Sequence, residues 1–183
     1  MDQPPSFRAH DHGHTAQFVA RTAIIDLANR THAGMARIPY TLLALLARLS
    51  IAAVFWSSGQ TKITGFAFNF ISGEFSFGWP RLADTAILLF EEEYKLPILA
   101  PRLGAVLAAV AEHVFPVMLL IGLGTRAAAL ALLGMTLVIQ LFVYPGAYAT
   151  HGTWAALLLM LMSRGAGVLS VDHWLAGRAR ISH

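Results

Sequence analysis

The sequence predicts an all-α membrane protein, in which an antiparallel bundle of four transmembrane helices carries a short interfacial helix between the first and the second. Composition is the first reason, because only 13% of the 183 residues are charged and 56% are hydrophobic. A soluble domain carries roughly 25% charged residues. Apolar runs are the second reason, since about 20 apolar residues cross a bilayer core. Four such runs follow one another, at 40–59, 101–123, 126–144 and 147–163.

The four runs differ in ways that set their arrangement. The first holds a single charge, Arg48. Only Gly124 and Thr125 separate the second run from the third, which predicts a tight antiparallel hairpin with Arg126 at the turn. The fourth run is short, so we expect it to be tilted or to thin the bilayer.

Residues 60–97 are expected to form a long mixed connection on the outer side of the membrane. Within it, Asp84 is expected to cap a short helix over 84–95 that stops before Pro97. This segment is too short to span a bilayer, and it combines an apolar patch with the acidic cluster at 91–93. It therefore predicts a helix lying at the membrane surface.

Three regions are predicted along the chain. Residues 1–37 are expected to be a polar, disordered cytoplasmic tail, with at most a short helix over 15–30 and no signal-peptide pattern. Residues 38–175 form the four-helix membrane domain, and 176–183 form a basic cytoplasmic tail. Ser170 is expected to cap a short amphipathic helix near the C-terminus.

The distribution of basic residues predicts the orientation. Cytoplasmic flanks carry an excess of Lys and Arg. With the N-terminus inside, the inner flanks hold Arg8, Arg21, Arg30, Arg37, Arg126, Arg164, Arg178 and Arg180. The outer flanks then hold Lys62, Arg81, Lys95 and Arg102. Both termini are therefore predicted to be cytoplasmic.

A polar centre inside the membrane is predicted from Arg48 and Glu112. At 1.5 Å per helical residue, Arg48 lies about 12 Å from the inner end of its helix and Glu112 about 15 Å from the outer end of its own. Similar depths on adjacent helices predict that the two charges pair, because a lone charge in hydrocarbon is costly. Two interpretations stay open: an ion pair that sets helix register, or a centre that binds a head group, a proton or a quinone oxygen.

Further polar residues are candidates for the same centre. Lys62 falls on the face of the first helix that carries Arg48, and Gly59 on that face would let another helix approach closely. Gln140 and Tyr144 form a stripe on the third helix, and His113 adjoins Glu112 but points about 100° away. Trp56, His151 and Trp154 are expected at the membrane–water interface.

Several classes of function are not supported by any motif. The chain has no Cys, and it has no Walker A loop, dinucleotide fingerprint, HExxH or nucleophile elbow. No catalytic residue is therefore predicted, and a non-catalytic subunit is favoured.

His113 and His151 lie at different depths, which argues against a shared haem or copper. No metal site is predicted, although the run HDHGH at 10–14 would chelate a metal weakly. The arginines flank apolar runs, which argues against nucleic-acid binding.

Short motifs occur in a distinctive order over residues 40–175. They are Arg48 followed by FWSSGQTK at 55–62, EYKLP at 93–97, AEH at 111–113, GLGTR at 122–126, QLFVYP at 140–145, His151 with Trp154, GAG at 165–167 and LSVD at 169–172. In this order the chain resembles the DoxX family of small bacterial membrane proteins. It departs from the family pattern at Ala166, where a proline is usual.

The resemblance implies a four-helix protein of the bacterial inner membrane with a link to redox systems. We therefore expect an anchor or accessory subunit of a redox or stress-response system, in contact with a quinone and with a soluble or membrane redox partner as well as the lipid bilayer. Homo-oligomers are compatible with this reading. Two alternatives remain: a small transporter or permease-like component for a solute or metal-related cargo, and a purely structural scaffold.

Overall fold

The computed structural model describes residues 12–69 and 73–181, and the chain divides into two units, Met1–Pro39 and Tyr40–His183. In the first unit, α1 (His12–Met35) is a helix of 24 residues. Its side chains from Ile24 to Met35 are exposed. A disordered tail with at most a short helix over 15–30 was expected here, so the helix is longer than expected.

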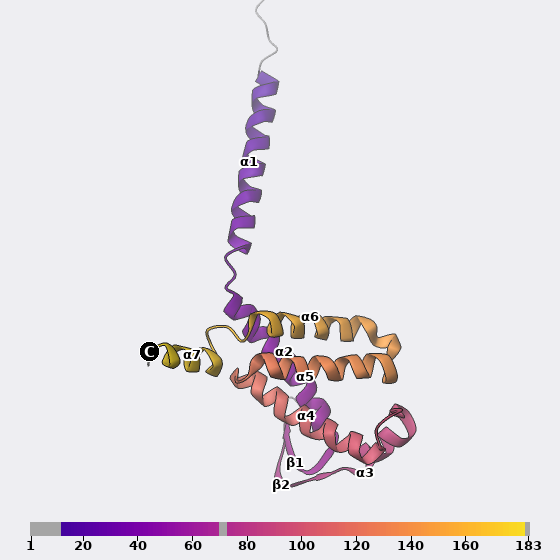
Figure 1. Ribbon diagram of the computed structural model, residues 1–183. Helices are drawn as coiled ribbons and strands as arrows, with labels where there is room; N and C mark the ends of the chain where they lie inside the picture. The colour runs from indigo at the N-terminus through magenta and orange to yellow at the C-terminus, as the bar shows by residue number, and fades with distance from the viewer. Residues whose placement is uncertain (1–11, 70–72, 182–183) are drawn as a thin grey trace, which may run out of the picture. The chain divides into compact units, whose positions relative to one another are not determined.

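Four helices of the second unit pack around a common core (Figure 1). Helix α2 lies against α4 and α6, and α5 also lies against α4 and α6. The core joins Ile51 and Phe55 of α2 to buried leucines of the other three helices, with alanines where the backbones approach. The helices are α2 (Tyr40–Gln60), α4 (Pro101–Ile121), α5 (Thr125–Val138) with its π-helical continuation η2 (Ile139–Val143), and α6 (Tyr148–Arg164).

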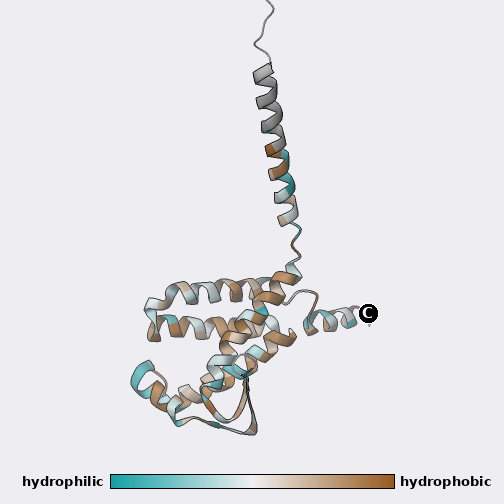
Figure 2. Ribbon diagram, turned by 180° about the vertical axis from the view of Figure 1, so that it is seen from behind, coloured by the Kyte–Doolittle hydropathy of each residue, from teal (hydrophilic) through white to brown (hydrophobic). Residues whose placement is uncertain are grey.

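Three helices in the described residues are long and apolar enough to cross a membrane. They are Tyr40–Gln60, Pro101–Ile121 and Thr125–Val143, with mean hydropathies of 1.6, 2.0 and 1.9. Only 22–39% of each apolar window is buried inside the protein. Leucines such as Leu46, Leu107 and Leu130 point outward instead, and apolar residues colour these helices brown in Figure 2. Apolar surface on this scale is covered by lipid. α6 has 17 residues and is shorter than these three.

A β-hairpin follows α2, and the sequence prediction of an all-α fold missed it. β1 (Ile63–Asn69) pairs antiparallel with β2 (Glu74–Leu82). Phe alternates with a small residue at 66–68 and again at 75–77, and a period of two residues is typical of a strand. Glycines at 65, 73 and 78 obscured this pattern, because they suggested an irregular loop.

The short helix expected after this connection is present, with two differences. α3 (Asp84–Leu88) continues as the π-helix η1 (Leu89–Tyr94), and Lys95 ends it in the left-handed conformation with φ of 43°. Asp84 was expected to cap the helix, and this is wrong, because the N-cap is Ala83 and no side chain caps the helix. The backbone N–H of Ala83 donates to the carbonyl of Lys62 at 2.9 Å, so the hairpin brings α3 back to the end of α2.

The C-terminal segment closes the end of the bundle where α4 meets α5. After the turn η3 (Pro145–Ala147) and α6, the chain forms α7 (Val171–Ile181). The Asp172 carboxylate accepts hydrogen bonds from the N–H groups of Gly124, at 2.7 Å, and Thr125, at 2.9 Å. It therefore caps the N-terminus of α5 from a distance of 47 residues in sequence. The predicted cap of α7 is confirmed, since Ser170 Oγ accepts from the N–H of His173 at 3.2 Å.

Asp172→Ala should lower the thermal stability of the detergent-purified protein. Two N–H groups at the start of α5 lose their acceptor, and loss of such a cap costs about 0.5–2 kcal/mol. A thermal-shift measurement checks this, with His173→Ala, an exposed neighbour, as the control. Equal melting temperatures for the two variants would contradict the capping role.

Candidate functional site

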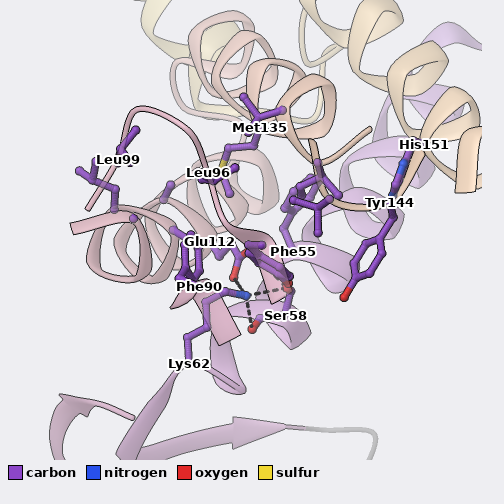
Figure 3. A pocket seen from close by; sticks show the side chains of 18 of the residues that line it. Phe55, Ser58, Lys62, Phe90, Leu96, Leu99, Glu112, Met135, Tyr144 and His151 are labelled. Carbon is purple, nitrogen blue, oxygen red and sulfur yellow. Dashed lines mark hydrogen bonds and ion pairs between the residues drawn. The ribbon is translucent and has the colours of Figure 1, made fainter. Parts of the chain in front are cut away.

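A cavity of about 480 Å³ lies where the four helices converge with η1 (Figure 3). Its wall is mostly aliphatic and aromatic. α2 contributes Phe55, α4 contributes Leu107 and Ala108, and α6 contributes Trp154. A few polar groups interrupt this wall, namely Ser58, Lys62, Tyr94, Glu112, Tyr144 and His151. An apolar cavity with a few converging polar groups is the usual form of a small-molecule site.

Lys62 and Glu112 form a buried ion pair in the cavity wall. Lys62 Nζ lies 2.7 Å from Glu112 Oε2, and each side chain is only 4% exposed. Ser58, one helical turn before Lys62, binds both partners: its hydroxyl donates to Glu112 Oε1 at 3.2 Å and accepts from Lys62 Nζ at 3.1 Å. Figure 3 shows the three side chains converging beside the cavity. A buried pair needs such additional hydrogen bonds to offset its desolvation.

Gly59 explains how α2 and α4 come close enough for this pair. A Cβ at position 59 would lie 3.0 Å from Glu112 Cβ and 2.9 Å from the ring of His113. Any larger residue would push the two helices apart. The prediction that Gly59 permits close helix approach is therefore confirmed.

His151 and Gln140 form a second polar group beside the cavity. His151 Nδ1 lies 2.7 Å from Gln140 Oε1, and Gln140 Nε2 donates to the carbonyl of Pro145 at 2.7 Å. Because an amide oxygen only accepts, Nδ1 carries the proton and Nε2 of the neutral ring is an acceptor. His151 is only 5% exposed, and its ring centroid lies 5.1 Å from that of Trp154. The structure places both residues in the cavity wall, and their expected level at the membrane–water interface stays a prediction.

Two tyrosines form the part of the wall next to the acidic cluster. The Tyr144 hydroxyl donates to the carboxylate of Glu93, and this bond is the main reason that the pKa of Tyr144 is raised above its ordinary value. Burial is the main reason that the pKa of Tyr94 is raised. The two rings lie edge to face, with centroids 6.0 Å apart. Both phenols therefore stay protonated at neutral pH and can donate hydrogen bonds.

Arg48 does not pair with Glu112, so this prediction was wrong. Its guanidinium is 2% exposed and donates instead to backbone carbonyls. The four acceptors, at 2.7–3.0 Å, are the carbonyls of Leu119, Leu120, Ala166 and Leu169. Two of these belong to the last turn of α4, where carbonyls have no partner within the helix. Arg48 therefore joins α2, the end of α4 and the loop after α6.

The depth estimate failed because α2 and α4 are staggered along their axes. The end of α4 at Ile121 lies beside Arg48, in the interior of α2, and not beside the first residues of α2. Glu112 lies seven residues before Leu119, which is about 10 Å along the helix. The space beside Arg48 is filled by Gly122, whose added Cβ would lie 3.2 Å from Arg48 Cζ, and by the 165–170 loop. The guanidinium has no side exposed to the cavity.

Two other candidate residues, His113 and Trp56, act with Gln60 to hold the hairpin rather than to line the cavity. His113 Nε2 lies 2.9 Å from Gln60 Nε2, and His113 Nδ1 lies 2.6 Å from the carbonyl of Ala109. Gln60 Oε1 accepts from the N–H of Phe68 at 2.7 Å, while Trp56 Nε1 donates to the carbonyl of Phe68 at 2.8 Å. These residues attach β1 to the last turn of α2.

Of the predicted centre, the structure brings Lys62, Glu112 and Tyr144 to one cavity, with Gln140 linked to it through His151. It assigns Arg48 and His113 to other contacts. Ser58 was missed, although its position four residues before Lys62 on a helix is a usable signal. Tyr94 was missed because only tertiary structure brings η1 to this place. In the described ranges, no three His, Cys, Asp or Glu side chains gather as a metal site; His10 and Asp11 of the HDHGH run lie outside those ranges.

Apolar helices of spanning length around a cavity with a buried ion pair define a helical membrane protein. The family model described as DoxX matches residues 43–145, which is more than half of the chain. The chain therefore belongs to the DoxX family. The match includes Ser58, Lys62, Glu112 and Tyr144, and it ends before His151 and Trp154. Comparisons with curated proteins and with solved structures gave no match.

Double-mutant cycles should separate the two buried charge networks. Lys62→Met alone and Glu112→Gln alone should each lower the unfolding free energy, by about 3–5 kcal/mol for a stranded charge. The Lys62→Met/Glu112→Gln double variant should recover a large part of that loss, because neither charge is then left alone. Thermal unfolding in detergent measures this.

Arg48→Met combined with Glu112→Gln is the matched comparison. Among the described residues these two side chains share no partner, so their losses should add to within about 0.5 kcal/mol. Coupling between Arg48 and Glu112, or additivity between Lys62 and Glu112, would contradict the networks described above.

Proposed function

We propose that this DoxX-family protein is a membrane anchor or accessory subunit of a redox or stress-response system, and that its cavity receives the ring of a quinone. The observation that supports this is the cavity of about 480 Å³, whose apolar wall carries a charged donor, Lys62, and an imidazole, His151. A quinone ring is planar and apolar, with a carbonyl oxygen at each end. It needs this combination of an apolar slot and a few fixed polar groups.

Each polar group has a defined part in holding such a ring. The weakest hydrogen bond of Lys62 is the 3.3 Å contact from Nζ to the carbonyl of Ser58. A quinone oxygen can replace that acceptor while the pair with Glu112 is kept. His151 Nε2 is an acceptor and can accept a hydrogen bond from a hydroxyl group of the reduced quinone. Phe55 and Trp154, with ring centroids 5.6 Å apart, present aromatic surface to the ring.

Purified full-length protein in nanodiscs should bind a short-chain ubiquinone, and tryptophan fluorescence quenching measures the affinity. The Lys62→Met/Glu112→Gln double variant avoids a stranded charge and removes the donor. A hydrogen bond from a charged group contributes about 1.5–3 kcal/mol, so the Kd should rise roughly 10- to 100-fold. Glu92→Gln, on the exposed surface of η1, is the control and should leave the Kd unchanged.

Two results would contradict the quinone proposal. One is the absence of saturable quenching in the unmodified protein, which favours the scaffold role. The other is an unchanged Kd in the double variant. Trp154→Phe adds a check on location, because it should remove most of the quenching if the ring binds in this cavity.

We further propose that four helices cross the membrane, with α6 as the short fourth one, and that both termini are cytoplasmic. Basic residues at one end of the second unit support this orientation. Arg126 lies in the first turn of α5 and Arg164 ends α6, and a Cβ at Gly165 would lie 3.7 Å from Arg126 Nε. α7, which carries Arg178, packs at the same end through Asp172. The positive-inside rule assigns that end to the cytoplasm.

Fusion reporters test the orientation. Alkaline phosphatase, which is active only outside the cytoplasm, should be inactive when fused after His183 and active when inserted at Gly73. Green fluorescent protein at the same two sites should show the opposite pattern. Strong phosphatase activity of the C-terminal fusion would contradict the proposed orientation.

A further inference from the structure

The β-hairpin carries an aromatic face that no other part of the described chain covers completely. The aromatic face consists of Phe66, Phe68, Phe75 and Phe77. Phe66 lies opposite Phe77 and Phe68 opposite Phe75, with edge-to-face rings whose centroids are 6.4 Å and 5.5 Å apart. Phe77 is 77% exposed, and the neighbouring Trp79 is 84% exposed. Partners directly opposite each other in register place their side chains on the same face of the hairpin.

The opposite face of the hairpin has a different character. The residues that alternate with the phenylalanines there are Ala67, Asn69, Glu74 and Ser76. Ser76 is exposed, and its hydroxyl donates to the carbonyl of Gly65 at 3.3 Å. The hairpin is therefore amphipathic across its thickness, with one small or polar face and one aromatic face. Exposed apolar surface of this kind marks an interaction site.

The backbone of the hairpin limits where that face can lie. In the described residues the sheet has two strands, so each strand has a ladder partner on one side only. Trp56 and Gln60 bind the Phe68 backbone, and outer-edge groups that the chain does not bind need water, which the hydrocarbon core of a bilayer does not supply. Full exposure to water is also unfavourable, because an isolated two-stranded hairpin is at best marginally stable there. The membrane interface satisfies both conditions, since it offers water to the edges and apolar depth to the rings.

The attachment of the hairpin places it at that level. α2 is long and apolar enough to cross the membrane and ends at Gln60, and β1 begins at Ile63. Trp56 and Gln60 hold the backbone of Phe68 against the last turn of α2. The end of a spanning helix lies near the head groups, where aromatic side chains are enriched. The hairpin is thus attached at the end of α2, at the level where the head groups are expected.

We propose that the aromatic face of the hairpin docks onto the lipid surface around α2 and anchors the hairpin in the interfacial layer. The occupant of this face is lipid rather than a second protein. The two ends of the hairpin are joined to each other. The carbonyl of Lys62, just before β1, accepts a hydrogen bond from the N–H of Ala83, just after β2. The site of lipid contact is independent of which molecule fills the cavity.

Single-cysteine labelling tests this proposal in the full chain, which has no native Cys. Phe77→Cys and Trp79→Cys report on the exposed aromatic side chains, and Ser76→Cys on the opposite face is the matched control. Each is labelled with the environment-sensitive dye NBD and reconstituted in vesicles of phosphatidylethanolamine and phosphatidylglycerol. At positions 77 and 79, NBD emission should be blue-shifted relative to position 76. At positions 77 and 79, a nitroxide near the lipid head group should quench NBD emission several-fold more strongly than at position 76. Aqueous iodide should quench it several-fold less than at position 76.

Trp79→Cys keeps both Phe pairs, so it remains informative if Phe77→Cys disturbs the hairpin. Emission and quenching equal to those of position 76 would show that the face is in water, which overturns the proposal. A blue shift without quenching by the lipid nitroxide would show that protein covers the face, and this also overturns it. Cross-linking between identical copies would then identify a second copy as the occupant.

Discussion

The structure depends on the cost of placing charge between apolar helices, because hydrocarbon supplies no partner for an ion. The chain meets this constraint in two ways. Lys62 and Glu112 neutralise each other, and Ser58 supplies the extra hydrogen bonds that the pair needs. Arg48 pairs with no carboxylate in the described residues and instead binds four carbonyls. A guanidinium suits this task, since its donors spread in a plane toward several acceptors.

These two networks lie at opposite ends of the bundle. Arg48 holds α2, the end of α4 and the 165–170 loop together, and Asp172 adds the cap of α5 at the same end. The Arg48 and Asp172 side chains there bind backbone groups. At the other end, Lys62, Glu112 and His151 lie beside open space. The Arg48 end thus holds helices whose opposite ends line the cavity, where the buried ion pair and His151 lie beside space that a ligand can enter.

Two π-helical segments shape that cavity. η1 brings Phe90 and Tyr94 to the wall, and η2 precedes Tyr144. A π-helical turn holds more residues than an α-helical turn, so it changes the direction of every side chain that follows. Such turns are rare and occur mostly at functional sites. Gln140 lies within η2 and orients His151, which links this irregular backbone directly to the polar groups of the site.

The sequence by itself determined the membrane class, the apolar helices, the DoxX family and the residues Lys62, Glu112 and Tyr144, because hydropathy, length and motif order are local properties. The hairpin was within reach of the same reasoning, since its alternating phenylalanines have the period of a strand. Only the tertiary structure decided which charge meets which. Depth along a helix follows from residue number, but axial stagger and rotation follow from packing, and these brought Glu112 to Lys62 and Arg48 to the carbonyls of α4. The inward position of His151 was decided in the same way, because its place in the wall depends on how α6 packs against α5.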